Sequence, residues 1–278
     1  MDVSDDPSVV ALGLEELELT NATACVPCSP EKPTPPAFFF SKGPGTYHVT
    51  SPLPVAARLK LVAALTAKGH ATGAVLLRGG EEKTRNDTDI EILFRQESYF
   101  AHLFGVAEPD CWGLIELPSG RATLLVPRLA PAYAVWMGKL HPPETFRRRY
   151  HVDACCFTDE IKATVETALA SSPGPVHVLD GINSDSNLNI ADVLSTAEAL
   201  PPAATVDRTA LYTIAAECRV VKSADEIDLM RYVAWVSSAA HANVMADTRP
   251  GMMEYQLEAL FVFHCACNPS PSTNPKPA

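Results

Sequence analysis

The sequence predicts an α/β domain followed by a helical region. Between residues 54 and 200, short apolar runs alternate with stretches whose apolar residues recur at helical spacing. Strands that alternate with helices along a chain are typical of one sheet covered by helices. Beyond Pro201 and Pro202 the character of the chain becomes helical, which indicates a second region. The length of 278 residues fits one large domain, or a domain plus a fragment.

The first 36 residues are acidic and then rich in proline, as in CVPCSPEKPTPP. Such a segment buries little apolar surface, so we expect a disordered tail over 1–36 and the α/β domain over 37–205. The first helix of the domain is predicted at 54–68. Its apolar residues recur at helical spacing, and Gly69 provides a C-terminal stop.

Four short apolar runs predict strands in the first half of the domain. Those at 74–77 and 90–94 are compatible with buried strands. The runs at 111–117 and 121–126 flank Pro118-Ser119-Gly120, a turn signal that predicts a β-hairpin. The remaining predicted elements of the domain are helices at 160–171 and 190–200 with a strand at 176–179 between them.

The helical region is predicted over 206–266 as a linker and two helices, with a disordered tail over 267–278. Ser223 and Glu226 have the spacing of a capping box, which marks the start of the first helix. The second helix is entered through Arg249-Pro250-Gly251. Both helices are amphipathic and need a partner surface, yet no predicted strand follows to provide one.

Charge and composition exclude two kinds of partner. The formal net charge of −11 argues against nucleic acid, whose binding depends on Lys and Arg. No run of about 18 apolar residues predicts a membrane helix, and the acidic start does not resemble a secretory signal. We therefore expect a cytoplasmic protein, in which the eight scattered cysteines are free thiols by default.

Motifs for known chemistry are absent or incomplete. The sequence contains neither a His-Glu-x-x-His zinc motif nor a Gly-x-Ser-x-Gly nucleophile elbow. Residues 42–46 resemble part of a phosphate loop but lack its Gly-Lys-Thr ending, so we interpret them as a turn. A zinc site could in principle be formed by Cys25, Cys28, His264, Cys265 and Cys267. Because these ligands lie at opposite ends of the chain, we favour unpaired thiols.

Two charged groups are interpreted as structural. Asp87 and Asp89 would leave most of the coordination of a hard cation unfilled, so a turn is favoured. Arg147, Arg148 and Arg149 are interpreted as a solvated helix face.

The segment 94–113 concentrates polar groups that resemble a catalytic centre. In an extended strand, Arg95, Glu97 and Tyr99 would share one side while their neighbours face the other, so the polar groups would be scattered. We therefore favour scaffold over catalysis. The other polar candidates of the segment are His102, Glu108, Asp110 and Cys111.

Several segments together resemble one family. They are ILFRQESYFAHLFGVAEPDCWGLIELPSGRATLLVPR, AVWMGKLH, FRRRYHVDACCFTDEI, GINSDS and ECRVVKSADEIDLMRYVAWVSSAAHANVM, with GGEE before them and PGMMEYQLEALF after them. This order resembles prolidases, the Xaa-Pro dipeptidases related to aminopeptidase P, from about Phe39 to His264. The resemblance implies an aminopeptidase P/creatinase-type N-terminal domain, with a mixed sheet and flanking helices, followed by the first helices of an incomplete pita-bread domain.

The family resemblance also implies what this chain lacks. Family members bind two manganese ions through two Asp, one His and two Glu, all downstream of the segment that matches 250–261. None of these ligands has a counterpart here, so we expect no catalytic residue, no bound metal and no dipeptidase activity of the chain alone. The sequence departs from the family after His264, which predicts a subunit truncated before its metal-binding part.

Trp136 is the one site residue that the resemblance implies. In the family, the tryptophan of this loop closes the active site of the partner subunit, and the N-terminal domain contributes to the dimer contact. The chain is thus expected to form a homodimer or a heterodimer with full-length prolidase. Two alternatives stay open: a stand-alone module that pairs with and modulates full-length prolidase, or an enzyme with an unrecognised site of its own.

Overall fold

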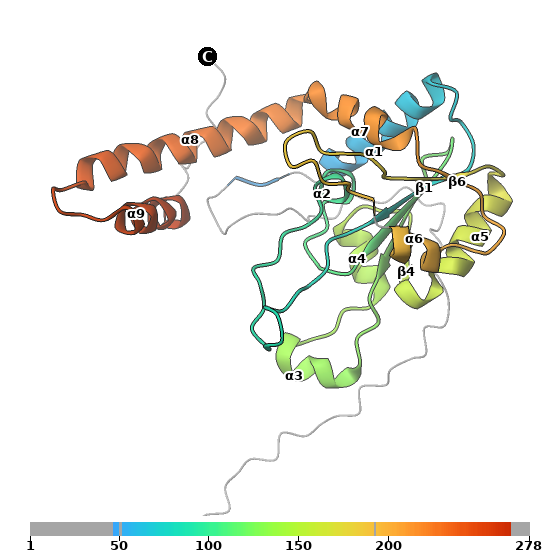
Figure 1. Cartoon of the computed structure of the whole chain (residues 1–278), viewed down its shortest axis with the longest axis horizontal. Helices are drawn as coiled ribbons and strands as arrows, with labels where there is room; N and C mark the ends of the chain where they lie inside the picture. Colours follow the sequence, from blue (N-terminus) through green and yellow to red (C-terminus); the bar gives the residue numbers. More distant parts are fainter. Residues whose placement is uncertain (1–46, 50–51, 192, 268–278) are drawn as a thin grey trace, which may run out of the picture.

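A mixed sheet forms the centre of the chain in the computed structural model, which describes residues 47–49, 52–191 and 193–267 (Figure 1). The tail predicted at 1–36, the turn at 42–46, Cys25 and Cys28 lie outside these residues, as does all but the first residue of the tail predicted at 267–278. The sheet has six strands in the order β4-β3-β2-β1-β5-β6. They are β1 (Ala74–Arg78), β2 (Trp112–Glu116), β3 (Ala122–Val126), β4 (Ala154–Phe157), β5 (Val176–Val178) and β6 (Val206–Asp207).

Only β2 runs against the other strands. It pairs antiparallel with both β1 and β3, whereas β3–β4, β1–β5 and β5–β6 are parallel pairs. The β2–β3 hairpin predicted around Pro118-Ser119-Gly120 is confirmed, with Trp112 opposite Leu125. The mixed sheet with flanking helices confirms the predicted fold class.

Helices bury both faces of the sheet. Val75 and Leu77 of β1 belong to one core, with α1 (Pro52–Ala67), α2 (Ser98–Phe104) and α7 (Leu211–Val220). Ala74 and Leu76 belong to the other core, with α5 (Ile161–Ser171) and α6 (Val193–Ala199). Because successive side chains of a strand point to opposite faces, a strand covered on both sides is a continuous apolar run. This explains why the prediction of a buried strand at 74–77 is right.

The strand predicted at 90–94 is wrong. The segment belongs to a loop whose one ladder contact is the isolated bridge between Thr84 and Glu91. The Arg85 N–H donates to the Ile90 carbonyl (2.8 Å) and the Ile92 N–H donates to the Lys83 carbonyl (2.9 Å), so the loop pairs with itself. An apolar run without a neighbouring strand in the sheet does not become a buried strand.

The extended segment expected after Phe94 is wrong from Glu97 onward. The Glu97 carboxylate accepts hydrogen bonds from the N–H groups of Tyr99 (3.0 Å) and Phe100 (2.7 Å) and thereby caps α2. Phe100 and Phe104 lie one turn apart, are fully buried and stack at 5.1 Å between ring centroids. Helical rather than strand alternation therefore decides which side chains of this segment enter the core.

Two short elements that were not predicted are η2 (Thr158–Glu160) and the edge strand β4, whose buried Cys155 lies opposite Leu124. The helix predicted at the arginine triplet is α4 (Pro143–Arg149). The default expectation of free thiols holds for Cys111, Cys155, Cys218, Cys265 and Cys267. It is wrong for Cys156, which is disulfide-bonded.

Two helices extend away from the sheet, α8 (Ala224–Asp247) and α9 (Glu254–Cys267), and pack against each other (Figure 1). The predicted capping box is confirmed: Ser223 N–H donates to Glu226 (2.7 Å), and Glu226 N–H donates to the Ser223 hydroxyl (3.3 Å). The rings of His241 and Phe261 meet across the pair at 4.7 Å. Of the helices described here, none has the length and apolarity needed to span a membrane.

Candidate functional site

The loops at one edge of the sheet hold the site residue that the sequence predicted. Because all strands except β2 run in one direction, the segments after β1 (79–97) and after β3 (127–142) both leave the carboxyl edge. Open α/β sheets usually bind their ligands beyond this edge. Figure 1 shows both loops extending from the sheet on the same side of the molecule.

Trp136 lies at the tip of the loop after β3. Two short helices, η1 (Pro131–Tyr133) and α3 (Ala134–Met137), form this tip, with Pro131 at the first helical turn. Gly138 ends α3 with a φ of +72°, which favours glycine, and its N–H donates to the Ala134 carbonyl (3.0 Å). The Trp136 side chain is 87% exposed, so it is not a partly buried anchor of its own domain.

Other large apolar side chains are exposed in the same two loops. We call this set the two-loop apolar surface. It consists of Ile90, Ile92, Leu93, Tyr133, Val135, Trp136 and Met137. Large apolar side chains that are exposed in this number are typical of surfaces that bind another molecule.

Gln96 fixes the base of the loop after β1. Its side-chain oxygen accepts a hydrogen bond from Gly80 N–H (2.5 Å), and its amide nitrogen donates to the carbonyls of Val106 (3.1 Å) and Glu108 (3.0 Å). Gly79 and Gly80 both lie close to this side chain, and an added Cβ at Gly80 would approach the Arg95 carbonyl at 2.9 Å. The loop therefore leaves the sheet from a defined anchor.

Polar groups of segment 94–113 make structural contacts. Glu108 pairs with Arg149 (2.9 Å) and accepts a hydrogen bond from the Tyr150 hydroxyl, while Glu97 caps α2. Cys111 is fully buried, and burial raises the pKa of its thiol well above the usual range. A thiol in that state is a poor nucleophile.

Three further members of that segment also lie apart from one another. His102 Nδ1 lies 3.6 Å from Glu226 Oε1 at the start of α8. Asp110 adopts a positive φ of 58° in the turn before β2, and burial raises the pKa of its carboxyl group. Arg95 is exposed in the loop after β1. The structure does not bring these groups together around one reacting atom.

The arginine triplet of α4 is only partly the solvated face that was predicted. Arg148 is exposed, but Arg147 and Arg149 are half-buried. Glu144 pairs with Arg147 (2.7 Å) and Arg148 (2.8 Å), and the hydrogen bond from Arg147 lowers the pKa of this carboxyl group. The triplet thus forms ion pairs within α4 and, through Arg149, an ion pair with Glu108.

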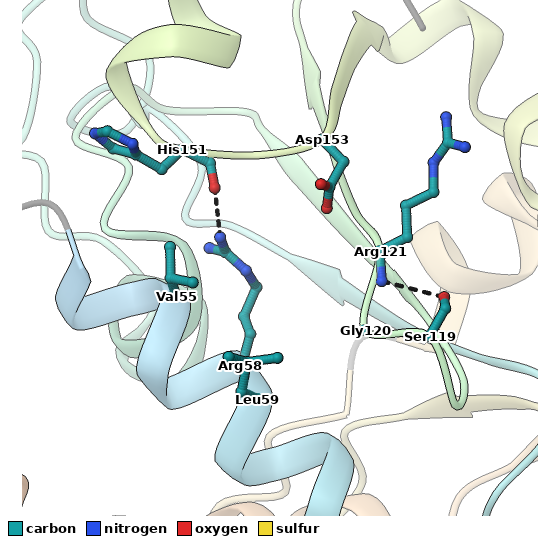
Figure 2. A pocket seen from close by; sticks show the side chains of 8 residues that line it. All are labelled: Val55, Arg58, Leu59, Ser119, Gly120, Arg121, His151 and Asp153. Atoms are coloured by element: carbon teal, nitrogen blue, oxygen red, sulfur yellow. Dashed lines mark hydrogen bonds between the residues drawn. The ribbon is translucent and has the colours of Figure 1, made fainter. Parts of the chain in front are cut away.

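A pocket of about 400 Å³ opens at the opposite edge of the sheet, beside α1 (Figure 2). Arg58 forms its floor and donates to the carbonyls of Leu103 (2.9 Å) and His151 (2.6 Å). Burial lowers the pKa of Arg58 to about 10, against the opposing effect of Asp153, so the guanidinium stays charged at neutral pH. The charge of Arg58 and the size of the pocket would suit a small anion, but the guanidinium already donates hydrogen bonds to two backbone carbonyls.

The same pocket contains Ser119, His151 and Asp153, the residue types of a hydrolase triad. Their geometry does not form one. Figure 2 shows the His151 ring pointing away from Asp153, whose carboxylate accepts a hydrogen bond from Ala122 N–H (2.8 Å). The Ser119 hydroxyl accepts from Arg121 N–H (3.2 Å), so no base is placed to activate it.

Metal-ligating groups are sparse in the part of the chain that the structure describes. Asp87 and Asp89 lie in the predicted turn, where Thr88 N–H donates to the Arg85 carbonyl (3.1 Å). Within the described ranges, one group of three side chains could share an ion: His70, His177 and Asp207. No sequence motif predicts this group, since the three residues are far apart along the chain.

That group does not fit the two-manganese centre that the family resemblance implies. Three donors, two of them imidazoles, are too few for two manganese ions, which favour carboxylate oxygens. No step of a peptidase reaction is therefore derived through these residues.

Solved structures share this fold. The chain aligns with aminopeptidase PepP from Pseudomonas aeruginosa at a TM-score of 0.60 and 26% identity, covering 78% of this chain and 49% of that chain. A zinc-substituted Escherichia coli aminopeptidase P in complex with product aligns at a TM-score of 0.58 and 22% identity, covering 78% and 49%. These likenesses show that the chain has the fold of solved aminopeptidase P structures over about half of their length.

The sequence comparisons show which proteins of this fold the chain resembles in sequence. Residues 56–177 match the family "Aminopeptidase P, N-terminal domain". Xaa-Pro dipeptidase of Mus musculus is 40% identical over 228 residues, which cover 81% of this chain and 45% of the relative. Residues 56–177 are thus similar to the N-terminal domain of aminopeptidase P, and the chain is similar to Xaa-Pro dipeptidases, of which it spans less than half the length.

Proposed function

We propose that this chain supplies the N-terminal, non-catalytic part of a Xaa-Pro dipeptidase-like subunit. In this role it forms the dimer contact and places Trp136 over the active site of the partner subunit. The observation that carries the proposal is the 87% exposure of Trp136 at the tip of a loop held away from the sheet. The complete subunit would take two manganese ions, and this chain would bind neither.

The chemistry of a tryptophan suits a covering role. An indole buries roughly 150–250 Å² when it is enclosed, which is a large gain for one side chain. A closed site also expels water, which strengthens the electrostatic interactions inside it. The neighbouring Val135 and Met137 are exposed as well, so the tip offers a continuous apolar stretch of chain to a partner.

The proposal makes the chain inactive by itself. Glu97 caps α2, Glu108 pairs with Arg149, and Cys155 is fully buried, which raises the pKa of its thiol to about 12. A peptide bond is hydrolysed rapidly when a metal activates water and polarises the carbonyl, and no such centre is proposed here.

The test combines the purified chain with a full-length Xaa-Pro dipeptidase. Light scattering after gel filtration should detect a mixed dimer of the two proteins. Trp136→Ala should weaken this dimer, or remove the effect of the bound chain on Gly-Pro hydrolysis by the full-length enzyme. Trp235→Ala is the matched control because that tryptophan lies in α8, outside the two-loop apolar surface. Equal effects of the two variants would contradict the role of Trp136. Manganese-dependent Gly-Pro hydrolysis by the chain alone would contradict its non-catalytic role.

A second candidate function is a stand-alone module that modulates full-length prolidase. It is favoured by α8 and α9, which expose large apolar side chains such as Met230, Met245 and Phe263. In that case deletion of α8 and α9 should abolish co-purification with the full-length enzyme, while Trp136→Ala should not. A chain that ignores the enzyme in both forms would exclude this function.

The cytoplasmic location stays a prediction. Five free thiols in the described ranges support a reducing compartment, whereas the disulfide of Cys156 argues for an oxidising one.

A further inference from the structure

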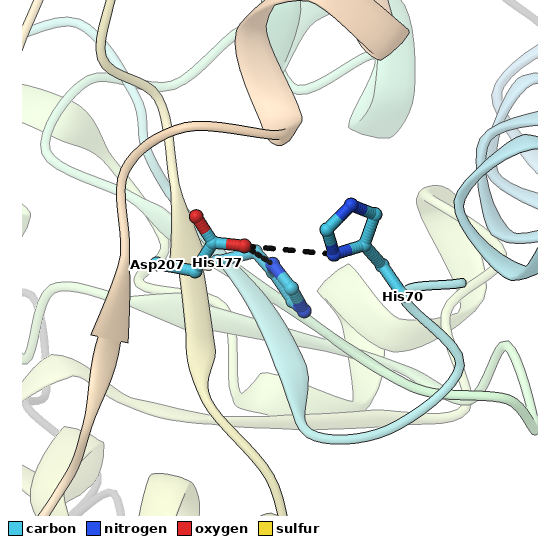
Figure 3. Close-up of side chains that lie close together, drawn as sticks. All are labelled: His70, His177 and Asp207. Atoms are coloured by element: carbon cyan, nitrogen blue, oxygen red, sulfur yellow. Dashed lines mark hydrogen bonds and ion pairs between the residues drawn. The ribbon is translucent and has the colours of Figure 1, made fainter. Parts of the chain in front are cut away.

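His70, His177 and Asp207 converge from three separate segments (Figure 3). His177 lies in β5 and is the register partner of Asp207 in β6. His70 lies in the turn between α1 and β1, where Gly69 has a φ of +89° and His70 N–H donates to the Leu65 carbonyl (2.9 Å). Backbone structure thus fixes the position of each side chain.

The donor atoms have the separations that one small ion requires. His177 Nδ1 lies 3.0 Å from Asp207 Oδ2, and His70 Nδ1 lies 3.6 Å from the same oxygen. One ligand atom from each residue lies within 4.8 Å of the other two. A tetrahedral ion with bonds of about 2.0–2.2 Å holds its donors roughly 3.3 Å apart, so small side-chain adjustments complete the geometry.

Asp207 is already oriented for this role. Its Oδ1 accepts hydrogen bonds from the N–H and the hydroxyl of Thr209, both at 2.7 Å, which leaves Oδ2 toward the two imidazoles. Burial raises the pKa of this carboxyl group, but the bonds from Thr209 and the neighbouring His177 outweigh it and lower the pKa. Such second contacts orient the ligands of metal sites.

His177 supplies an independent observation. Its side chain is 1% exposed, and its Nε2 has no hydrogen-bond partner among the residues that the structure describes. Buried polar atoms usually have a partner, and an exception calls for an ion, a water molecule or a chemical role. An ion bound at Nε2 of this ring would supply the missing interaction directly, whereas an ion bound at Nδ1 would leave Nε2 to a water molecule.

We propose that His70, His177 and Asp207 bind one Zn²⁺ ion, with water in the fourth position. Two imidazoles and one carboxylate form a donor set typical of zinc, whereas Mn²⁺ and Mg²⁺ favour oxygen. The open position faces solvent, since the His70 side chain is 33% exposed. The ion would join the α1–β1 turn to β5 and the two-residue edge strand β6, and would thereby stabilise that edge of the sheet.

The test is a titration of the untagged, metal-free full chain with Zn²⁺ by calorimetry. We expect one ion per chain, and an affinity for Mn²⁺ at least about tenfold lower. His70→Ala and Asp207→Asn should each weaken zinc binding by more than about tenfold, because even the loss of an outer contact costs that much. His264→Ala is the matched control, since this histidine also faces an aspartate, Asp247, at 3.3 Å.

Two further measurements keep the proposal falsifiable. Co²⁺ in the site should show weak visible bands without the thiolate charge-transfer band that Cys265 or Cys267 would produce. Zinc should raise the unfolding temperature of the wild type and of His264→Ala but not of His70→Ala. Because His70 is partly exposed, its variant decides the question even if a His177 variant fails to fold. No zinc binding, a thiolate band, or unchanged affinity in His70→Ala would overturn the proposal.

Discussion

The α/β part of the chain and the α8–α9 pair contrast in how they bury their apolar residues. The helices on the sheet cover both of its faces, and β1, β2 and β3 each contribute side chains to both cores. In α8 one residue, Ala240, is buried, and in α9 none is. A helix buries its apolar face only by packing against another element. Two helices that pack only against each other therefore leave much of their apolar surface in water.

This contrast teaches where stability resides. The α/β part draws on hydrophobic burial, whereas the pair depends on its capping box, helix propensity and one seam between the helices. Local opening free energies should therefore be higher in the sheet than in α9. Four experiments test the contrast, from the largest expected effect to the smallest.

The largest effect is expected at Phe104. Phe104→Ala removes a fully buried ring that stacks on Phe100 and touches the space above Gly113, so it should cost about 3–5 kcal/mol of unfolding free energy. Phe263→Ala in α9 removes an exposed ring and should change stability by less than about 0.5 kcal/mol. Urea unfolding followed by circular dichroism measures both. Similar costs at the two positions would mean that the helical pair is packed as tightly as the sheet.

A smaller effect is expected at the capping box. Ser223→Ala removes the acceptor for Glu226 N–H and should destabilise α8 by about 1 kcal/mol. Ser238→Ala is the control, because this exposed serine lies inside α8, where alanine favours the helix. Limited proteolysis should cleave Ser223→Ala faster within 224–267 and leave the sheet intact. Unchanged cleavage would show that packing, not the cap, holds α8.

Hydrogen exchange compares the two regions without substitution. Amides of β2 and β3, whose side chains are almost all buried, should exchange slowest, and those of α9 should exchange at least about tenfold faster. If a full-length Xaa-Pro dipeptidase covers α8 and α9 in a complex, its addition should slow exchange there. Slow exchange of α9 in the free chain would contradict the contrast.

The smallest effect concerns His102, at the junction of the two regions. Burial lowers its pKa below 6.5, Glu226 raises it, and Arg219 and Lys60 lower it further. The unfolded chain thus binds a proton more readily, so this contribution to stability is present above pH 6.5 and is lost as the pH falls through the folded-state pKa. The unfolding free energy of His102→Gln should change less between pH 7.5 and 5.5 than that of the wild type. An equal change would assign the pH dependence to other groups.

The carboxyl-edge site could be predicted only in part. The family resemblance led to Trp136, but it could not place Ile90, Ile92 and Leu93 in solvent, because their apolar run is typical of a buried strand. The strand prediction failed since no neighbouring strand accepts their backbone groups. That the loop after β1 leaves the same edge of the sheet as the loop after β3 can be recognised only when the direction of every strand is known.

The sequence by itself determined the elements whose signals are local: the apolar run of β1, the turn of the β2–β3 hairpin and the capping box of Ser223 and Glu226. Only the tertiary structure decided that Glu97 caps a helix, that Trp136 stands in solvent and that His70 meets His177 and Asp207. The physical reason is range. Caps and turns join residues a few positions apart, whereas packing and shared ligands depend on segments that the sheet brings together.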